Sequence, residues 1–172
     1  MSDPERVAME VLRTFKVEKA PIPIERIAKG LGATLQFEPF EGKGDVSAML
    51  YRDDERTVIG VNSTHGRTRQ RFSIAHECGH LKLHKGKMYV DGKVNFRDSI
   101  SALAIDKEEI EANAFAAELL MPREFVVAEI KKALRQHDQH DADSIVPELA
   151  RVFDVSPLAM EFRLKNLGFI VE

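Results

Sequence analysis

The sequence contains a single cysteine, Cys78, among its 172 residues, and it has no long apolar run. One cysteine cannot form an internal disulfide, which suits a reducing compartment. No apolar stretch approaches the roughly 18 residues that a membrane-spanning helix needs. The first residues, MSDPERVAMEVLRTF, include acidic side chains and lack the apolar centre of a secretory signal peptide. We therefore expect a cytoplasmic protein that does not associate with a membrane.

An excess of positive charge is also lacking, because 25 basic and 28 acidic residues give a formal net charge of -3. The chain therefore offers no general positive field for nucleic acid. The segment at about 145–172 has the rhythm of a helix-turn-helix, but it carries three basic and four acidic side chains. A DNA-reading helix needs phosphate-directed Lys and Arg, so we expect this tail to pack on the rest of the protein. At this length, one domain over residues 1–172 is the expectation.

Hydrophobic periodicity predicts a mixture of helices and strands. A strand is expected over 33–37, and a β-hairpin is expected with strands at 45–51 and 57–62. The segment 85–105 contains glycines and charges and is expected to be a loop with little regular structure. The predicted helices cover 4–15, 23–31, 68–83, 107–121, 123–134, 145–153 and 157–167.

The sequence HECGH at 76–80 is an HExxH motif inside one of these predicted helices. Side chains four residues apart project from one face of a helix, so His76 and His80 can bind the same metal ion. Glu77 borders that face, where it can take a proton from a metal-bound water that attacks a carbonyl. Two imidazoles and an open coordination position favour Zn²⁺, with Mn²⁺ and Fe²⁺ as alternatives.

Two small residues inside the motif have structural explanations. Cys78 lies about 200° around the helix from His76, so we expect it in the core and not on the metal. Gly79 costs about 1 kcal/mol relative to alanine in a helix interior. We expect its benefit to be space, which lets another element approach beside the metal-binding face.

Two histidines require a third protein ligand to complete a zinc site. His84 continues the same row but lies about 12 Å along the helix from His76, so it is expected as a helix cap or as a partner of a ligand. His65 is expected in a loop. His137 and His140 are expected to be solvated in a polar connector.

The predicted helix at 107–121 offers acidic ligands. Asp106 and Glu109 have the spacing of a capping box, and Glu108 and Glu109 then fall in the first turn, where the helix dipole favours carboxylates. Glu111 and Glu118 lie deeper, on a stripe of small and apolar residues, where a carboxylate needs a partner that a metal would supply. Spacing alone leaves both of these acids open.

The segments RQRFSIAHECGHLKLH (69–84) and EEIEANAFAAELLMP (108–122) resemble the ImmA/IrrE family of bacterial and phage metallopeptidases. The resemblance extends to VIGVN before the motif and to the tail, and so covers most of the chain. It implies an α+β, zincin-like fold with a small β-sheet packed on the HExxH helix and a mainly helical C-terminal part. It also implies that the glutamate of the EAN triplet, Glu111, is the third metal ligand. The family usually has leucine after the motif glutamate, where this chain has Cys78.

Members of this family are typically encoded beside a helix-turn-helix repressor and cleave it, which releases genes for mobile-element transfer, prophage induction or stress response. The resemblance therefore implies a zinc-dependent endopeptidase that regulates transcription by cutting one specific protein partner. The alternative is a metal-binding regulator, or half of a toxin–antitoxin pair, that binds its partner without cutting it. Glu77 favours the peptidase, because a structural metal site needs no general base.

Overall fold

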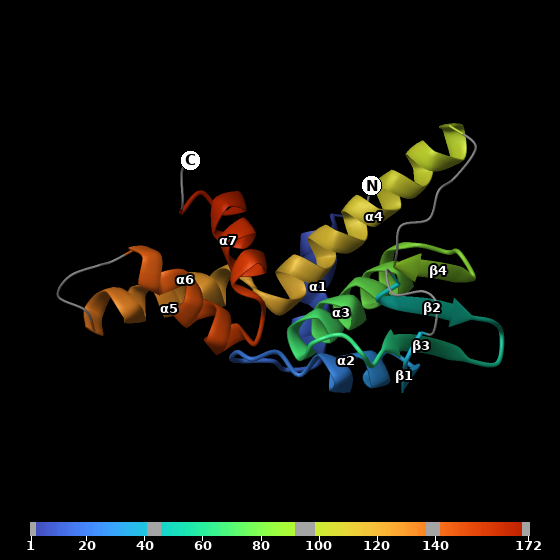
Figure 1. The fold of residues 1–172 in the computed structure, drawn as a ribbon, viewed down its shortest axis with the longest axis horizontal. Coiled ribbons are helices and arrows are strands. Elements are labelled where there is room, and N and C mark those ends of the chain that lie inside the picture. The colour runs from blue at the N-terminus through green and yellow to red at the C-terminus, as the bar shows by residue number, and fades with distance from the viewer. Residues whose placement is uncertain (1–2, 41–45, 92–98, 137–141, 170–172) are drawn as a thin grey trace.

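The fold combines seven helices with one four-stranded sheet in the part of the chain that the structure describes (Figure 1). This computed structural model describes residues 3–40, 46–91, 99–136 and 142–169, with the backbone alone for 99–106, 136 and 142–144. The elements are α1 (Pro4–Thr14), α2 (Ile24–Gly30), β1 (Ala33–Glu38), β2 (Ala48–Arg52), β3 (Thr57–Asn62), α3 (Arg67–Leu83), β4 (Met88–Asp91), α4 (Ser99–Leu120), α5 (Arg123–Gln136), α6 (Ala142–Phe153) and α7 (Pro157–Asn166). None of these helices is both long and apolar enough to cross a membrane.

The sheet has the strand order β1-β3-β2-β4. Strands β2 and β3 form the predicted antiparallel hairpin, whose turn is closed by the Asp53 carboxylate as it accepts from the backbone N–H groups of Glu55 and Arg56. The predicted strand at 33–37 is β1, which pairs in parallel with β3. Leu50 and Ile59 are fully buried and face each other across the hairpin. The helices and the sheet together confirm an α+β fold.

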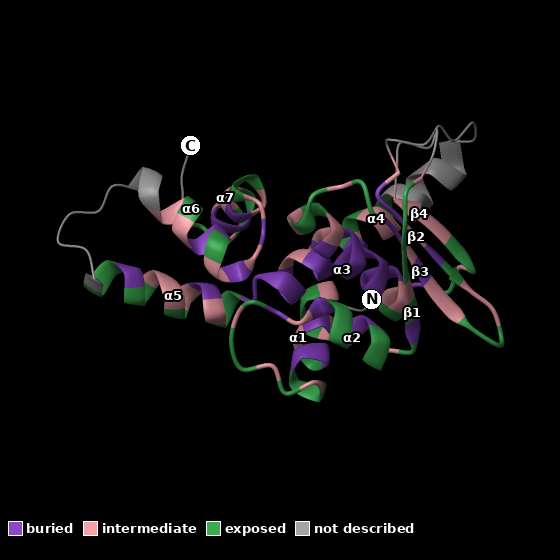
Figure 2. Cartoon of the chain, turned by 60° about the horizontal axis from the view of Figure 1, so that its bottom comes forward, coloured by how far each residue is buried: buried purple, intermediate pink, exposed green. Residues whose placement is uncertain are grey.

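Helix α3, which carries the HExxH motif, lies between the sheet and α4 (Figures 1 and 2). Every residue from Ser73 to His80 is buried, so this part of α3 is enclosed on all sides. The end of the helix is fixed by Arg52 of β2, whose guanidinium donates to the backbone carbonyls of Leu81, His84 and Gly86. These carbonyls lie at or beyond the last turn, where no helical N–H reaches them. The motif is therefore held in register with the sheet.

The prediction of a loop over residues 85–105 is wrong at both of its ends. Residues Met88–Asp91 form β4, which pairs with β2, and α4 begins at Ser99, about two turns before the predicted start. Asp106 lies inside α4, so it does not cap that helix. The segment SISALAID at 99–106 contains neither glycine nor proline, so nothing in it interrupts a helix. A strand of four residues is too short for its alternation to be recognised.

The C-terminal helices contribute side chains to the main hydrophobic core. Phe153, Met160 and Leu164 belong to the same hydrophobic core as α3 and α4. The buried guanidinium of Arg163, on α7, forms an ion pair with Glu118 of α4 and donates to the carbonyl of Met121. Burial of two charges is tolerated because each is paired and hydrogen-bonded.

Helix α4 packs closely on α3 at Gly79, as the position of this glycine in the motif predicted. A methyl group added there would lie 3.0 Å from Ala112 Cα, 3.1 Å from the Ala112 carbonyl oxygen and 3.2 Å from the Phe115 ring. The backbone of α4 cannot move aside without shifting the whole helix.

We expect Gly79→Ala to lower the free energy of unfolding by up to about 2 kcal/mol. Overpacking costs about 1–3 kcal/mol, which exceeds the gain of about 1 kcal/mol that alanine brings to a helix. Urea denaturation followed by circular dichroism measures the difference. A more stable variant would show that helix propensity and not the approach of α4 governs this position.

Candidate metal centre

Three side chains from α3 and α4 converge on one point. His76 Nε2 lies 3.0 Å from His80 Nε2, and the two atoms lie 3.1 and 3.2 Å from the carboxylate oxygens of Glu109. Both histidines are buried, and Glu109 is partly buried. The nitrogen and oxygen atoms that these residues direct at one another all lie within 4.8 Å.

This spacing fits a tetrahedral metal site. Zinc bonds of about 2.0–2.1 Å at tetrahedral angles separate neighbouring ligand atoms by about 3.3 Å, which is close to the three observed distances of 3.0–3.2 Å. Two neutral imidazole nitrogens facing each other need a cation or a proton between them. The donor set of two imidazoles and one carboxylate is that of hydrolytic zinc sites, which keep a further position open.

The partner of His76 fixes which of its nitrogens faces the cluster. Its Nδ1 lies 3.0 Å from Asn113 Oδ1, one turn beyond Glu109 on α4. An amide oxygen only accepts, so Nδ1 carries the proton and Nε2 presents a lone pair to the cluster. Hydrogen bonds of this kind orient metal-binding histidines and raise their basicity.

His80 is supported by a longer chain of partners. Its Nδ1 lies 3.0 Å from His84 Nδ1, and His84 Nε2 lies 3.1 Å from Glu111 Oε2. If Nδ1 of His80 donates, His84 receives at Nδ1 and donates from Nε2 to the Glu111 carboxylate. The ring of Tyr89 on β4 stacks on His80 at a centroid distance of 4.1 Å. The orientation of the His80 ring is therefore fixed by a hydrogen bond at its edge and by stacking on its face.

The geometry favours Glu109 over Glu111 as the third ligand. The carboxylate of Glu111 lies against His84 and not in the cluster, and Glu118 is paired with Arg163. The prediction excluded Glu109 because it placed this residue in the first turn of its helix. Since α4 begins at Ser99, Glu109 lies in the third turn and faces α3. Its spacing of four from Asn113, on one helix face, is the signal that the sequence held.

Glu77 is the most unusual carboxylate in the protein. It is fully buried, and neither carboxylate oxygen has a hydrogen-bond partner among the described residues. Burial, together with the negative charges of Asp91 and Glu109, raises the pKa of Glu77 well above its usual value of 4.5. Such a group is costly unless something occupies the space beside it. A water molecule held at the open position of a metal would be such a partner.

The pKa of Glu109 is shifted in the opposite direction to that of Glu77. Although burial opposes ionisation, hydrogen bonds from His76 and His80 lower the pKa of Glu109 to about 2. Glu109 therefore carries a negative charge at neutral pH, as a metal ligand must. By contrast, burial and the charge of Glu77 raise the pKa of the Cys78 thiol to about 12. Cys78 is fully buried, which confirms its predicted place in the core.

Neither His65 nor His84, the two other histidines that the structure describes, belongs to the cluster. His65 lies in the connection between β3 and α3. His84 is the C-cap residue of α3 and contacts the cluster only through His80. His137 and His140 lie outside the described residues.

Comparisons with known proteins identify the family and the fold. Residues 28–165 match the profile of the family Peptidase_M78, described as an IrrE N-terminal-like domain. The chain is 34% identical over 111 residues to the "Uncharacterized immunity region protein 2" of Bacillus phage phi105, and this match covers 63% of the chain and 66% of the phage protein. A solved structure, "Mycobacterium tuberculosis transcriptional regulator", shares the fold with a TM-score of 0.56 and 19% identity over 95% of the chain and 46% of that protein. The chain spans less than two thirds of either relative.

Three glutamine variants separate the roles of the glutamates on α4. We expect Glu109→Gln to lose stoichiometric zinc on dialysis, because it removes a ligand. Glu111→Gln should weaken zinc binding about 10- to 100-fold, as is typical when a residue that supports a ligand through hydrogen bonds is changed. Glu118→Gln should keep zinc but lower the free energy of unfolding by about 3–5 kcal/mol, because it leaves Arg163 buried without a counter-charge. Competition titration against a chelator measures the affinities, and loss of zinc in Glu111→Gln alone would reverse the assignment.

Glu77→Gln tests the cost of the unpartnered carboxylate. The pKa of Glu77 is raised in the folded state. The contribution of this group to the free energy of unfolding is therefore most favourable below pH 4.5, its unfolded pKa, and decreases as the pH rises from 4.5 toward the folded pKa. In protein stripped of metal with a chelator, we expect Glu77→Gln to raise the free energy of unfolding by about 1–3 kcal/mol at pH 7, with no gain below pH about 4. The exposed Glu124→Gln is the matched control and should change it by less than about 0.5 kcal/mol. Equal stabilities at pH 7 would mean that Glu77 has a partner.

Proposed function

The chain belongs to the family of IrrE N-terminal-like domains, and from this premise we propose that it is a zinc-dependent endopeptidase that cleaves a specific protein partner. The observation that carries this proposal is Glu77, a buried carboxylate without a hydrogen-bond partner among the described residues, beside a His–His–Glu cluster. His76, His80 and Glu109 would hold the metal. When bound, a zinc ion supplies a Lewis acid that polarises water and the scissile carbonyl.

Glu77 then serves as the general base. A carboxylate with a raised pKa is well matched to accept a proton from water at neutral pH and to pass it to the leaving nitrogen. The buried environment prevents bulk water from satisfying the carboxylate, so its basicity is kept for the reacting water. Asn113 and the His84–Glu111 pair keep the two imidazoles in the tautomers that face the cluster.

The alternative, a metal-binding regulator that does not cut, leaves Glu77 without a purpose. A structural zinc site is closed by four protein ligands, whereas the cluster contains three among the described residues. An ionisable group buried without a partner lowers stability, and a purely structural site would gain by replacing it. These two features favour the peptidase.

For the substrate, we propose a helix-turn-helix repressor. Two observations support this choice. The motifs resemble those of metallopeptidases that cleave repressors encoded beside them, and the phage relative is named for an immunity region. Cleavage of such a repressor would link the enzyme to the control of mobile-element or stress genes.

Incubation of the zinc-loaded protein with the repressor encoded beside its gene tests both parts of the proposal. We expect one or a few defined cuts, detected by mass spectrometry, and a fall of about 10²- to 10⁴-fold in cleavage rate for Glu77→Gln, because this change removes the general base. Zinc content should stay near one per chain in that variant. If the repressor is released from its operator equally well by Glu77→Gln, the regulator acts without cutting.

A further inference from the structure

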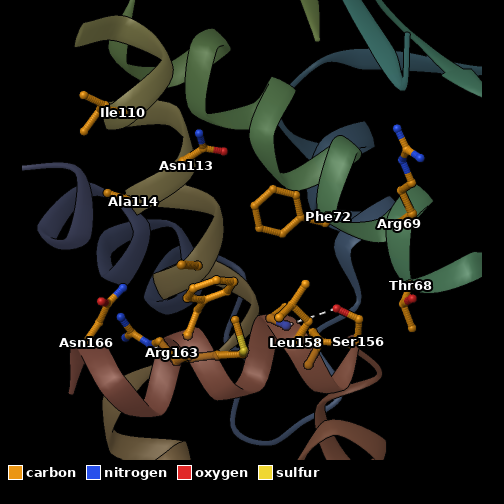
Figure 3. A pocket seen from close by; sticks show the side chains of 15 residues that line it. Thr68, Arg69, Phe72, Ile110, Asn113, Ala114, Ser156, Leu158, Arg163 and Asn166 are labelled. Carbon is orange, nitrogen blue, oxygen red and sulfur yellow. Dashed lines mark hydrogen bonds between the residues drawn. The ribbon is translucent and has the colours of Figure 1, made fainter. Parts of the chain in front are cut away.

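An apolar groove lies between α7 and the pair α3 and α4, with a volume of about 720 Å³ (Figure 3). Phe72 of α3 and Ala114 of α4 line it from one side. From α7, Leu158 and Phe162 line the other side, although 61% and 57% of their surfaces are exposed. Ile110 of α4 adds a third large apolar side chain, which is 68% exposed. Large apolar side chains gathered around one groove mark a binding surface more often than chance exposure does.

The groove lies next to the metal centre and shares Asn113 with it. Asn113 lines the groove and also hydrogen-bonds the His76 ring. Phe72 lies one turn before His76 on α3, and Asn113 lies one turn after Glu109 on α4, so both helices lead from the cluster directly into the groove. One turn of four residues is about 6 Å along a helix, which an extended peptide spans with about two residues.

The two arginines that line the groove, Arg69 and Arg163, differ in whether a carboxylate neutralises them. Arg163 is neutralised by Glu118. Among the described residues, Arg69 donates to the Ser47 hydroxyl alone, at 3.1 and 2.8 Å, and forms no ion pair. Figure 3 shows Arg69 and Thr68 at one end of the groove and Ile110 at the other. The Arg69 end is thus cationic, next to an apolar surface.

We propose that this groove binds the protein substrate through bulky apolar side chains that begin about two residues from the scissile bond, with an acidic residue beside Arg69. This inference rests on the proposed endopeptidase function. The groove is of the size in which proteins bind compact ligands, about 300–1,000 Å³. Substrate choice then depends on α7 of the tail, which contributes Leu158 and Phe162 to the site.

A displayed library of random dodecapeptides, selected on the zinc-loaded Glu77→Gln protein, tests binding independently of cleavage. We expect the selected peptides to be rich in Leu, Ile, Met and Phe. Their affinity, measured by fluorescence polarisation, should fall at least tenfold in Leu158→Ser and in Phe162→Ser, because each loses apolar burial. Leu134→Ser on α5 and Phe37→Ser on β1 are matched controls, since both are similarly exposed and lie outside the groove. Their affinities should stay within twofold, and Arg69→Gln should remove the preference for an acidic residue.

Several outcomes would overturn the groove proposal. These are the absence of selected binders, binders without apolar enrichment, and affinities that the two groove variants leave unchanged. A second copy of the chain as occupant would appear in sedimentation as a dimer that Phe162→Ser dissociates. The selected peptides are then given to the active protein. If the peptides bind in the groove but are not cleaved, the endopeptidase proposal is wrong and the groove proposal stands. If they are cleaved and neither groove variant changes the cleavage, the groove proposal is wrong and the endopeptidase proposal stands.

Discussion

The contact between α3 and α4 at Gly79 is the constraint on which the site depends. His76 and His80 lie on one helix and Glu109 on the other, so the cluster exists only if the two backbones approach closely. A residue without a side chain in the middle of α3 permits that approach, and Ala112 provides a flat surface opposite it. Gly79 thus lowers the stability of α3 as a helix, but it permits the close approach that brings His76, His80 and Glu109 together.

The buried polar groups around this contact differ in whether they are paired. Glu118 and Arg163 are buried but neutralise each other, so they serve to join α7 to α4. Glu109, Asn113, His84 and Glu111 form hydrogen bonds that lead toward the imidazoles. The Glu77 carboxylate, by contrast, is buried without a hydrogen-bond partner among the described residues. Under the proposed function, stability is lowered at a position where reactivity requires it, which is a common relation between active sites and their folds.

Much of this arrangement could be predicted from the sequence, since helical spacing alone brings His76, Glu77 and His80 to one region. The hairpin, the buried Cys78 and the close approach at Gly79 also followed from local patterns. The place of Glu109 beside the two histidines did not follow, because it depends on where α4 begins. A capping-box pattern at Asp106 suggested a helix start about two turns later than the observed one, and this error placed Glu109 in the first turn and not in the helix interior. The groove was also beyond prediction, since it is formed by segments more than 80 residues apart, such as Phe72 and Leu158.

The buried thiol has a practical consequence. Thiolates and not thiols react with alkylating reagents and oxidants, and a pKa of about 12 together with full burial keeps Cys78 in the unreactive form. The folded protein therefore has no chemically addressable sulfhydryl. A cysteine introduced at any exposed position would be the single site of attachment for a fluorophore or spin label, so distances across the molecule can be followed without first replacing a native residue.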